Sequence, residues 1–403
     1  MKLTVDNFFF YLLCFFPVFL VAGPFLADLA LTLLCFYFLI KVFLEKNWKL
    51  LNNTFFLFFF LFYLYLLVNS LFNSGLFISI KSSLTYIRFG LFIMAINYIL
   101  KYNERKISVI FYFYILTLII LIFDSIFQKY FGTNIIGIHQ YDSVRVSSFF
   151  RDKLILGGFV IKMIPIIYIL FFFLDLKKKK YLFLIPIIGI VPIILSAEKS
   201  AIALYILFLV FHIFAYKLRI VFKILVFFIF VSLILTLLVY NPNVKNRVFD
   251  QALSNSENGK YIFSRVHHSH FLTAFNMFVD KPFFGQGPNT FRVKCSEKLF
   301  QHDEFACSTH PHNYYVQLLG ETGIVGFSFL FLFFIYILIN LIKKIYSIIK
   351  KNSINYSVYY SFVGLFLSFI PISSTGNFFN NWTASIYSLL IGFSIFSIKK
   401  IKC

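Results

Sequence analysis

The chain has 403 residues, of which 60% are hydrophobic and only 13% are charged, and its formal net charge is +21. A soluble domain carries roughly 25% charged residues, so this composition excludes an ordinary soluble protein. Apolar runs of about 20 residues recur along the whole length, and each is long enough to cross a bilayer as a helix. In such a protein the positive charge reports topology first, and we expect a lipid bilayer and no nucleic acid as its partner.

Continuous apolar runs without strict alternation favour membrane helices over a β-barrel. The sequence therefore predicts an all-α polytopic membrane protein, formed as a single integral membrane domain over residues 1–403. The first run is followed at once by a second, and no small-residue cleavage site separates them, so we expect no cleavable signal peptide. About twelve spans are predicted: residues 7–23, 25–43, 54–72, 82–100, 107–127, 155–174, 181–196, 199–216, 220–240, 314–341, 355–372 and 381–398.

Basic residues predict the orientation of these spans, because cytoplasmic loops carry an excess of Lys and Arg. Alternate connections hold 21 of the 37 basic residues, and this predicts that these connections and both termini lie in the cytoplasm. The residues are Lys2, Lys41, Lys46, Lys49, Lys101, Arg105, Lys106, Lys177 to Lys180, Lys217, Arg219, Lys223, Lys343, Lys344, Lys350, Lys351, Lys399, Lys400 and Lys402.

Two substantial loops lie on the opposite, periplasmic face in this topology. The first covers residues 128–154, and the larger one covers residues 241–313, between spans nine and ten. The larger loop contains Cys295 and Cys307, and an oxidising periplasm favours a disulfide between them. Two free thiols, or metal ligation together with nearby histidines, are the alternatives.

Several basic residues fall on the outer side and indicate an anionic ligand there. Arg145 and Arg151 lie in the first loop, Lys199 in the turn SAEKSA, Arg265 in the large loop, and Arg88 inside span four. Phosphate and pyrophosphate are natural partners of Arg, whose guanidinium donates hydrogen bonds in pairs. A single exposed Arg is ordinarily a solvated surface charge, but a charge within a span usually lines a polar cavity.

Acidic residues are scarce in the predicted spans, where Asp28 and Asp124 lie near the outer ends. A proton-coupled transporter keeps carboxylates inside the membrane, and a Mg²⁺-dependent transferase needs them at its site. We therefore expect neither a metal nor a cofactor.

The segment CSTHPHNYYVQLLGETGIVG, residues 307–326, is the polar end of the large loop. Pro311 biases His310 towards an extended conformation, while Asn313 is suited to cap the helix that follows. His312 then lies just outside a helix N-terminus, where an imidazole with an ordinary pKa serves as a general base. For His310 the alternative is a structural histidine that bonds a carbonyl. A further cluster, His267, His268 and His270, is interpreted as mostly structural.

The spacing of His312-Asn313, nine residues, Gly323-x-x-Gly326 and then Phe329 resembles the signature of the O-antigen ligase family and of the related O-antigen polymerases. Two further segments resemble the same superfamily. They are RVHHSHFLTAFNMFVDKPFFGQGPNTFRVKC, which contains a D-x-P-x-x-G-x-G-x-x-x-F turn, and RVSSFFRDKLILGGF in the first periplasmic loop.

The resemblance implies a metal-independent, inverting glycosyltransferase of the GT-C type, whose donor is a glycan on undecaprenyl pyrophosphate. Ligases of this family pass the glycan to lipid A core at the periplasmic face. The resemblance makes His312 the base and Arg265 a pyrophosphate contact, with Arg88, Arg145 and Arg151 as further candidates. Where the family has an Arg before span eight, this chain has Lys199, which keeps the charge and loses the bidentate fork.

The acceptor stays open at this point. An O-antigen polymerase would use a second glycan chain, and a protein O-oligosaccharyltransferase would use a Ser or Thr hydroxyl. A polysaccharide exporter or flippase is the alternative from another class. We further expect Gly323 and Gly326 to allow close helix packing, and Gly285 and Gly287 to shape a turn.

Overall fold

The computed structural model describes residues 2–73, 77–174, 184–215, 219–250, 264–350 and 355–400. Lys177 to Lys180, Lys217, Lys351 and Lys402 of the predicted cytoplasmic set lie outside these ranges. Within them the chain forms helices and one isolated β-bridge, between Thr133 and His139. The α-helices are α1 (Lys2–Cys14), α2 (Phe16–Ala22), α3 (Pro24–Leu44), α4 (Thr54–Phe72), α5 (Phe77–Leu84), α6 (Ile87–Tyr102), α7 (Ile107–Phe131), α8 (Leu156–Phe171), α9 (Leu184–Leu195), α10 (Lys199–Ala215), α11 (Ile220–Val239), α12 (Pro242–Lys245), α14 (Arg265–Asp280), α15 (Phe291–Lys294), α16 (Tyr314–Ile349), α17 (Tyr356–Phe369) and α18 (Asn381–Lys399).

Among the described residues, 7 helices are long and apolar enough to cross a membrane. The first predicted span is a bent pair, in which α1 and α2 meet at 51°. Shorter apolar helices occupy the positions of four other predicted spans: Leu156–Phe171, Ile185–Leu195, Lys199–Ala215 and Tyr356–Phe369. The chain is therefore an all-helical, multi-pass membrane protein. The count of twelve stays a prediction, because four of these helices are short for a full crossing.

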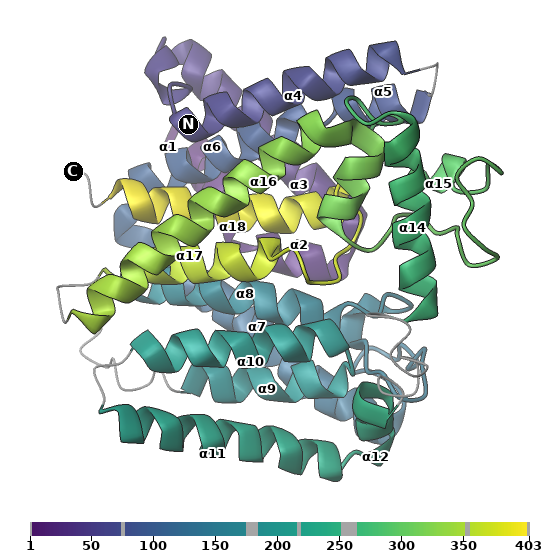
Figure 1. Cartoon of the computed structure of the whole chain (residues 1–403). Coiled ribbons are helices and arrows are strands. Elements are labelled where there is room, and N and C mark those ends of the chain that lie inside the picture. Colours follow the sequence, from purple (N-terminus) through teal and green to yellow (C-terminus); the bar gives the residue numbers. More distant parts are fainter. Residues whose placement is uncertain are drawn as a thin grey trace.

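Most long helices run side by side in one bundle, and Figure 1 shows the labelled N- and C-termini at one end of it. At the opposite end, α14 runs across the ends of the other helices with α15 beside it, and α12 lies at the same end of the bundle, next to the end of α11. We call these the terminal end and the loop end. Three contacts join basic residues to the terminal end: Lys41 with Asp6 at 2.7 Å, Lys106 with Asn7 at 2.8 Å and Lys400 with Glu104 at 2.8 Å.

Helix α16 breaks at Gly323, whose φ of 63° and ψ of −169° are not helical. The break receives the segment 282–287: Gly287 N donates to Glu321 O at 2.7 Å, and Ile324 N donates to Pro282 O at 2.8 Å. A side chain on Gly323 would overlap the backbone of Phe283. The expectation of helix packing at Gly323 is therefore wrong, because this glycine allows a loop to dock. Close helix approach occurs at Gly326, where a Cβ would lie 3.0 Å from the Tyr65 ring of α4, and at Gly320, where it would lie 2.7 Å from Ala274 O of α14.

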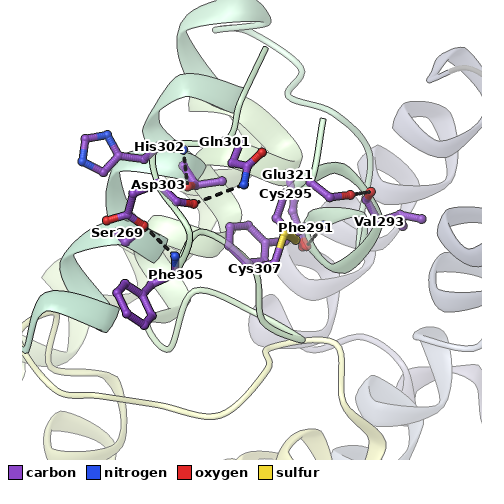
Figure 2. Close-up of a disulfide and its surroundings, with 12 residues drawn as sticks. Ser269, Phe291, Val293, Cys295, Gln301, His302, Asp303, Phe305, Cys307 and Glu321 are labelled. Carbon is purple, nitrogen blue, oxygen red and sulfur yellow. Dashed lines mark hydrogen bonds between the residues drawn. A yellow bond between two sulfur atoms is a disulfide. The ribbon is translucent and has the colours of Figure 1, made fainter. Parts of the chain in front are cut away.

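The large loop has a small core of its own beneath α14. Its buried members are Ala274, Met277, Phe291, Cys295 and Phe300. Cys295 forms a disulfide with Cys307, and Figure 2 shows this bond beside α15. The disulfide closes the segment that carries Asp303, whose carboxylate accepts hydrogen bonds from Ser269 Oγ and Phe305 N. The loop is thus fastened to α14 and α15 directly before the histidine segment begins.

Candidate active site

Asn313 fixes the start of α16. Its Oδ1 accepts hydrogen bonds from Tyr315 N at 2.9 Å and Val316 N at 3.1 Å, which is the capping geometry that the sequence predicts. Its Nδ2 donates to Pro371 O at 2.6 Å, in the loop between α17 and α18. Asn313 therefore joins the helix N-terminus to a segment almost sixty residues further along the chain.

Four histidines meet in front of this N-terminus, and we call them the histidine cluster. The His312 ring centroid lies 4.2 Å from that of His310, 5.0 Å from that of His267 and 5.5 Å from that of His270. His267 and His270 are three residues apart, so they share one face of α14. His268 instead lies near His302, with ring centroids 6.4 Å apart. The structure thus places two residues of the H-H-x-H run at the site.

The two histidines of the motif have different surroundings. His310 Nε2 donates to Thr375 O at 3.2 Å, and its Nδ1 accepts from Thr309 Oγ1 at 2.9 Å, so both nitrogens are occupied in one neutral tautomer. Among the described residues the His312 ring has one hydrogen-bond contact, and it is long: 3.4 Å between Nε2 and Ser308 Oγ. The backbone of His312 has a φ of 57°, a value that side-chain-bearing residues seldom adopt outside functional or turn positions. Of the two motif histidines, His312 therefore has the less fully bonded ring among the described residues.

The whole cluster is held neutral. Burial, reinforced by His310, His267 and His270, lowers the pKa of His312 to about 3. Burial likewise lowers the pKa of His310 to about 4 and lowers the pKa of both His267 and His270. The physical cause is that an imidazolium loses its hydration here and meets other groups that become positive. An unprotonated imidazole is the form that a general base requires.

Permanent positive charges surround the cluster. Lys199 is close enough to His267 to lower its pKa, and Arg292 acts on His310 in the same way. Arg247 lies near both Lys199 and Arg145, and it extends this positive region along the loop end. Arg247 and Arg292 belong to the basic residues of the large loop, and nothing local in the sequence distinguishes them from the other basic residues of that loop. The neutral histidines thus lie in a field that attracts an anion.

The turn between α9 and α10 is built around Glu198. Its carboxylate accepts the backbone N–H groups of Gly157 at 2.8 Å and Gly158 at 3.2 Å, at the N-terminus of α8. Arg145 holds the same turn, donating to Ser196 O at 3.2 Å and to Leu154 O at 2.7 Å. Burial raises the pKa of Glu198 to about 7, although Arg145 and the two amides oppose this. Glu198 and Arg145 thereby fix the position of Lys199.

The other predicted cations have their own contacts. Arg88 forms an ion pair with Asp28 at 2.8 Å, and no contact among the described residues joins its side chain to the histidine cluster. Arg265 lies at the start of α14, 3.5 Å from Glu304 and over the Phe305 ring, with half of its side chain exposed. Arg151 is exposed and has a φ of 56°.

Glu321 is an acidic residue within the tenth predicted span, whereas the sequence alone pointed only to Asp28 and Asp124. It is buried in α16, and its oxygens accept from Phe291 N at 2.8 Å, Asn289 N at 3.0 Å and Gln317 Nε2 at 3.1 Å. These bonds hold the D-x-P-x-x-G-x-G-x-x-x-F turn against α16. Gly285 and Gly287 have φ values of 65° and 106° within that turn, the left-handed conformation that glycine supplies.

Within the described residues, no group of three or more His, Cys, Asp or Glu side chains has a geometry that could hold a metal ion. The His312 ring is stacked on that of His270 and tilted against those of His267 and His310. The chemistry open to the arrangement is proton abstraction by a neutral imidazole beside a positively charged region.

Part of the chain matches a known protein family. Residues 182–331 match the family model described as O-Antigen ligase. This range contains Lys199, Arg265, the histidine cluster and Glu321, and it ends within the first half of α16. No curated protein matches the chain significantly.

Proposed function

We propose that the chain is a membrane enzyme of the ligase or polymerase type, because residues 182–331 match the O-antigen ligase family model. From this premise we propose that the enzyme transfers a glycan from undecaprenyl pyrophosphate to an acceptor hydroxyl at the periplasmic face of the bacterial inner membrane. The acceptor that we favour is lipid A core. The observation that carries the proposal is a neutral, accessible His312 between three other histidines and a set of fixed cations.

The donor brings negative charge to the site. Lys199, together with Arg145, Arg247 and Arg292, would stabilise the negative charge that develops on the leaving pyrophosphate in the transition state. Arg265 would join them on release of Glu304, to which it is only loosely paired. In this role Arg88 is the weakest candidate, because Asp28 already balances its charge.

His312 would remove the proton of the acceptor hydroxyl as that oxygen attacks the anomeric carbon. The new C–O bond forms while the bond to the pyrophosphate oxygen breaks, so direct displacement inverts the carbon, and no metal takes part. Binding of an anion also reverses the electrostatics of the cluster. Its charge raises the low pKa of His312 and makes the imidazole a stronger base when the donor is present.

The test is transfer by purified protein that is supplied with an undecaprenyl-pyrophosphate glycan. His312→Ala is expected to lower kcat by at least about 100-fold, the scale of a lost general base, and added imidazole is expected to restore part of it. Asn380→Ala is a suitable control, because Asn380 caps α18 and does not touch the cluster. Wild-type transfer by His312→Ala would remove the base assignment.

The acceptor is decided by offering lipid A core, a second lipid-linked glycan and a Ser-containing peptide in separate reactions. Extension of lipid A core supports the ligase. Extension of the second glycan would make the protein a polymerase, and glycosylation of the peptide would make it a protein O-oligosaccharyltransferase. Transfer to none of them, with glycan movement across vesicles, would favour an exporter.

A further inference from the structure

The loop between α17 and α18 also contacts the histidine segment. Thr375 N donates to His312 O at 2.9 Å, and Thr375 O accepts from His310 Nε2 at 3.2 Å. Both main-chain polar groups of one residue are therefore bonded to the two motif histidines. This loop lies beyond residues 182–331, so the family match does not include it.

Asn377 holds this loop in place, because both the Nδ2 and the Oδ1 of its side-chain amide form hydrogen bonds. Its Nδ2 donates to Asn289 Oδ1 at 3.1 Å and to Thr309 O at 3.4 Å. Its Oδ1 accepts from Gln317 Nε2 at 3.0 Å and from Phe379 N at 2.8 Å. Asn377 is buried, and a buried amide with all its bonds made confers a single arrangement on its neighbours. The loop thus has a fixed position relative to α16, the glycine turn and the histidine segment.

The side chain of Thr375 differs from its main chain, whose two polar groups are both hydrogen-bonded. Its Oγ1 is buried and has no hydrogen-bond partner among the described residues, although the hydroxyl can both donate and accept. An unpaired buried hydroxyl destabilises a fold, so its presence beside a functional site points to a role outside the fold. His270 Nδ1, in the same cluster, is also buried without a partner.

We propose that residues 371–378 form the second wall of the active site, and that the Thr375 hydroxyl donates a hydrogen bond to a substrate oxygen next to His312. The proposal rests on the proposed function, since it assigns a contact for the same substrates. Both a pyrophosphate oxygen of the donor and the attacking hydroxyl of the acceptor offer the required chemistry. Asn377 is a positioning residue in this arrangement, because it acts through the histidine segment.

Thr375→Val is the sharpest test, because it removes only the hydroxyl and keeps the shape of the side chain. We expect kcat/KM for transfer to fall about 10-fold, the scale of one lost hydrogen bond, while the thermal midpoint stays the same or rises. Thr375→Ser restores the hydroxyl and should keep most of the activity. Thr85→Val, which removes an exposed threonine hydroxyl outside this loop, is the matched control and should change neither quantity.

Separate titrations of the two substrates identify the contact. A rise in KM for the undecaprenyl-pyrophosphate glycan assigns the hydroxyl to the donor, and a rise in KM for the acceptor assigns it to the acceptor. Unchanged kinetics in Thr375→Val would overturn the proposal. A lower thermal midpoint together with lower activity would also overturn it, because the hydroxyl would then serve the fold.

Asn377→Ala tests the positioning role in the same assay. We expect a lower kcat, with KM for both substrates within about twofold, because binding groups stay and the base is misplaced. In the imidazole-rescued His312→Ala protein the same substitution should cause a smaller loss than in the wild type, because no fixed base remains to be positioned. A multiplicative loss there would overturn this role. If His312→Ala itself transfers like the wild type, the proposed function fails; if it is inactive and Thr375→Val is normal, only the present inference fails.

Discussion

At the scale of single residues, side chains of the same chemical type differ in their surroundings, and the sequence does not show this difference. His310 and His312 are two positions apart, yet the first has both nitrogens bonded and the second has one long contact. Lys199 and Arg265 are both basic residues in outer loops. The first lies beside the histidine cluster and the second beside Glu304. Chemical type alone therefore does not assign a role in this site.

The low pKa of His312 predicts an unusual pH profile. Burial and the neighbours His310, His267 and His270 lower this pKa to about 3, so the neutral base persists far into the acid range. We expect kcat/KM to stay level from pH 8 to pH 5, whereas an ordinary histidine with a pKa near 6.5 would lose about 30-fold. Initial rates in a constant-ionic-strength buffer series measure this. An acid limb centred near pH 6.5 would contradict it.

The thermal midpoint must be measured at each pH, because the lowered pKa values of the histidines also affect the stability of the fold. The unfolded chain binds protons at its histidines below about pH 6.5, and the folded cluster does not. The contribution of the buried cluster is present above that pH and is lost as pH falls towards the folded-state pKa values. A rate that declines together with the thermal midpoint therefore reports unfolding and not the base.

Lys199 should be replaceable by Arg but not by Ala. Lys199→Arg keeps the charge next to His267, so we expect kcat within about threefold of wild type. Lys199→Ala leaves the pyrophosphate without this cation, and we expect a loss of about 100-fold, the scale of one transition-state contact. Steady-state transfer rates give both values. Lys298→Ala, at an exposed position in the large loop, serves as the control, and an equal loss there would refute a specific role.

At the scale of elements, the site depends on segments that dock by backbone contact. The turn 282–287 enters the break in α16, and the loop after α17 bonds to the histidine segment. Helix α14 brings His267 and His270 and packs on α16 at Gly320. Three separate segments thereby hold one short stretch of chain.

Gly323→Ala should damage this docking more than a left-handed glycine elsewhere. At Gly323 a Cβ meets both an unfavourable φ and the Phe283 backbone, while at Gly137, with a φ of 85°, nothing lies within 4 Å. We expect Gly137→Ala to destabilise the protein by about 1 kcal/mol and Gly323→Ala by about 3 kcal/mol or more. Unfolding in denaturing detergent compares the two. Equal losses would show that the overlap relaxes.

At the scale of the whole molecule, the bundle has two chemically different ends. The terminal end carries both chain termini and paired lysines, and the loop end carries α14, the disulfide and the histidine cluster. An exposed chain segment at one end cannot reach the other through the apolar bundle. Substrates that meet at the histidine cluster must therefore arrive from the side of the membrane that the loop end faces.

Cysteine labelling tests which side that is. In a Cys403→Ser background, Leu299→Cys at the loop end should react with an impermeant maleimide in intact spheroplasts, because 68% of Leu299 is exposed. Asn52→Cys, exposed in the connection between α3 and α4, should react only after permeabilisation. Cys14 and Cys35 are buried and provide a low background. The reverse pattern of labelling would invert the predicted topology.

The sequence by itself determined that the chain is a bundle of membrane helices and where most of those helices lie, because apolar runs are local signals that need no tertiary contact. It also determined the cap at Asn313 and the glycine turn, which depend on residues close together in the chain. Only the tertiary structure decided that His267 and His270 join His312, that Glu321 and Glu198 organise the loops, and that Thr375 bonds both motif histidines. These contacts join residues from about 30 to more than 60 positions apart, and at such separations a sequence pattern does not show which residues are close in space.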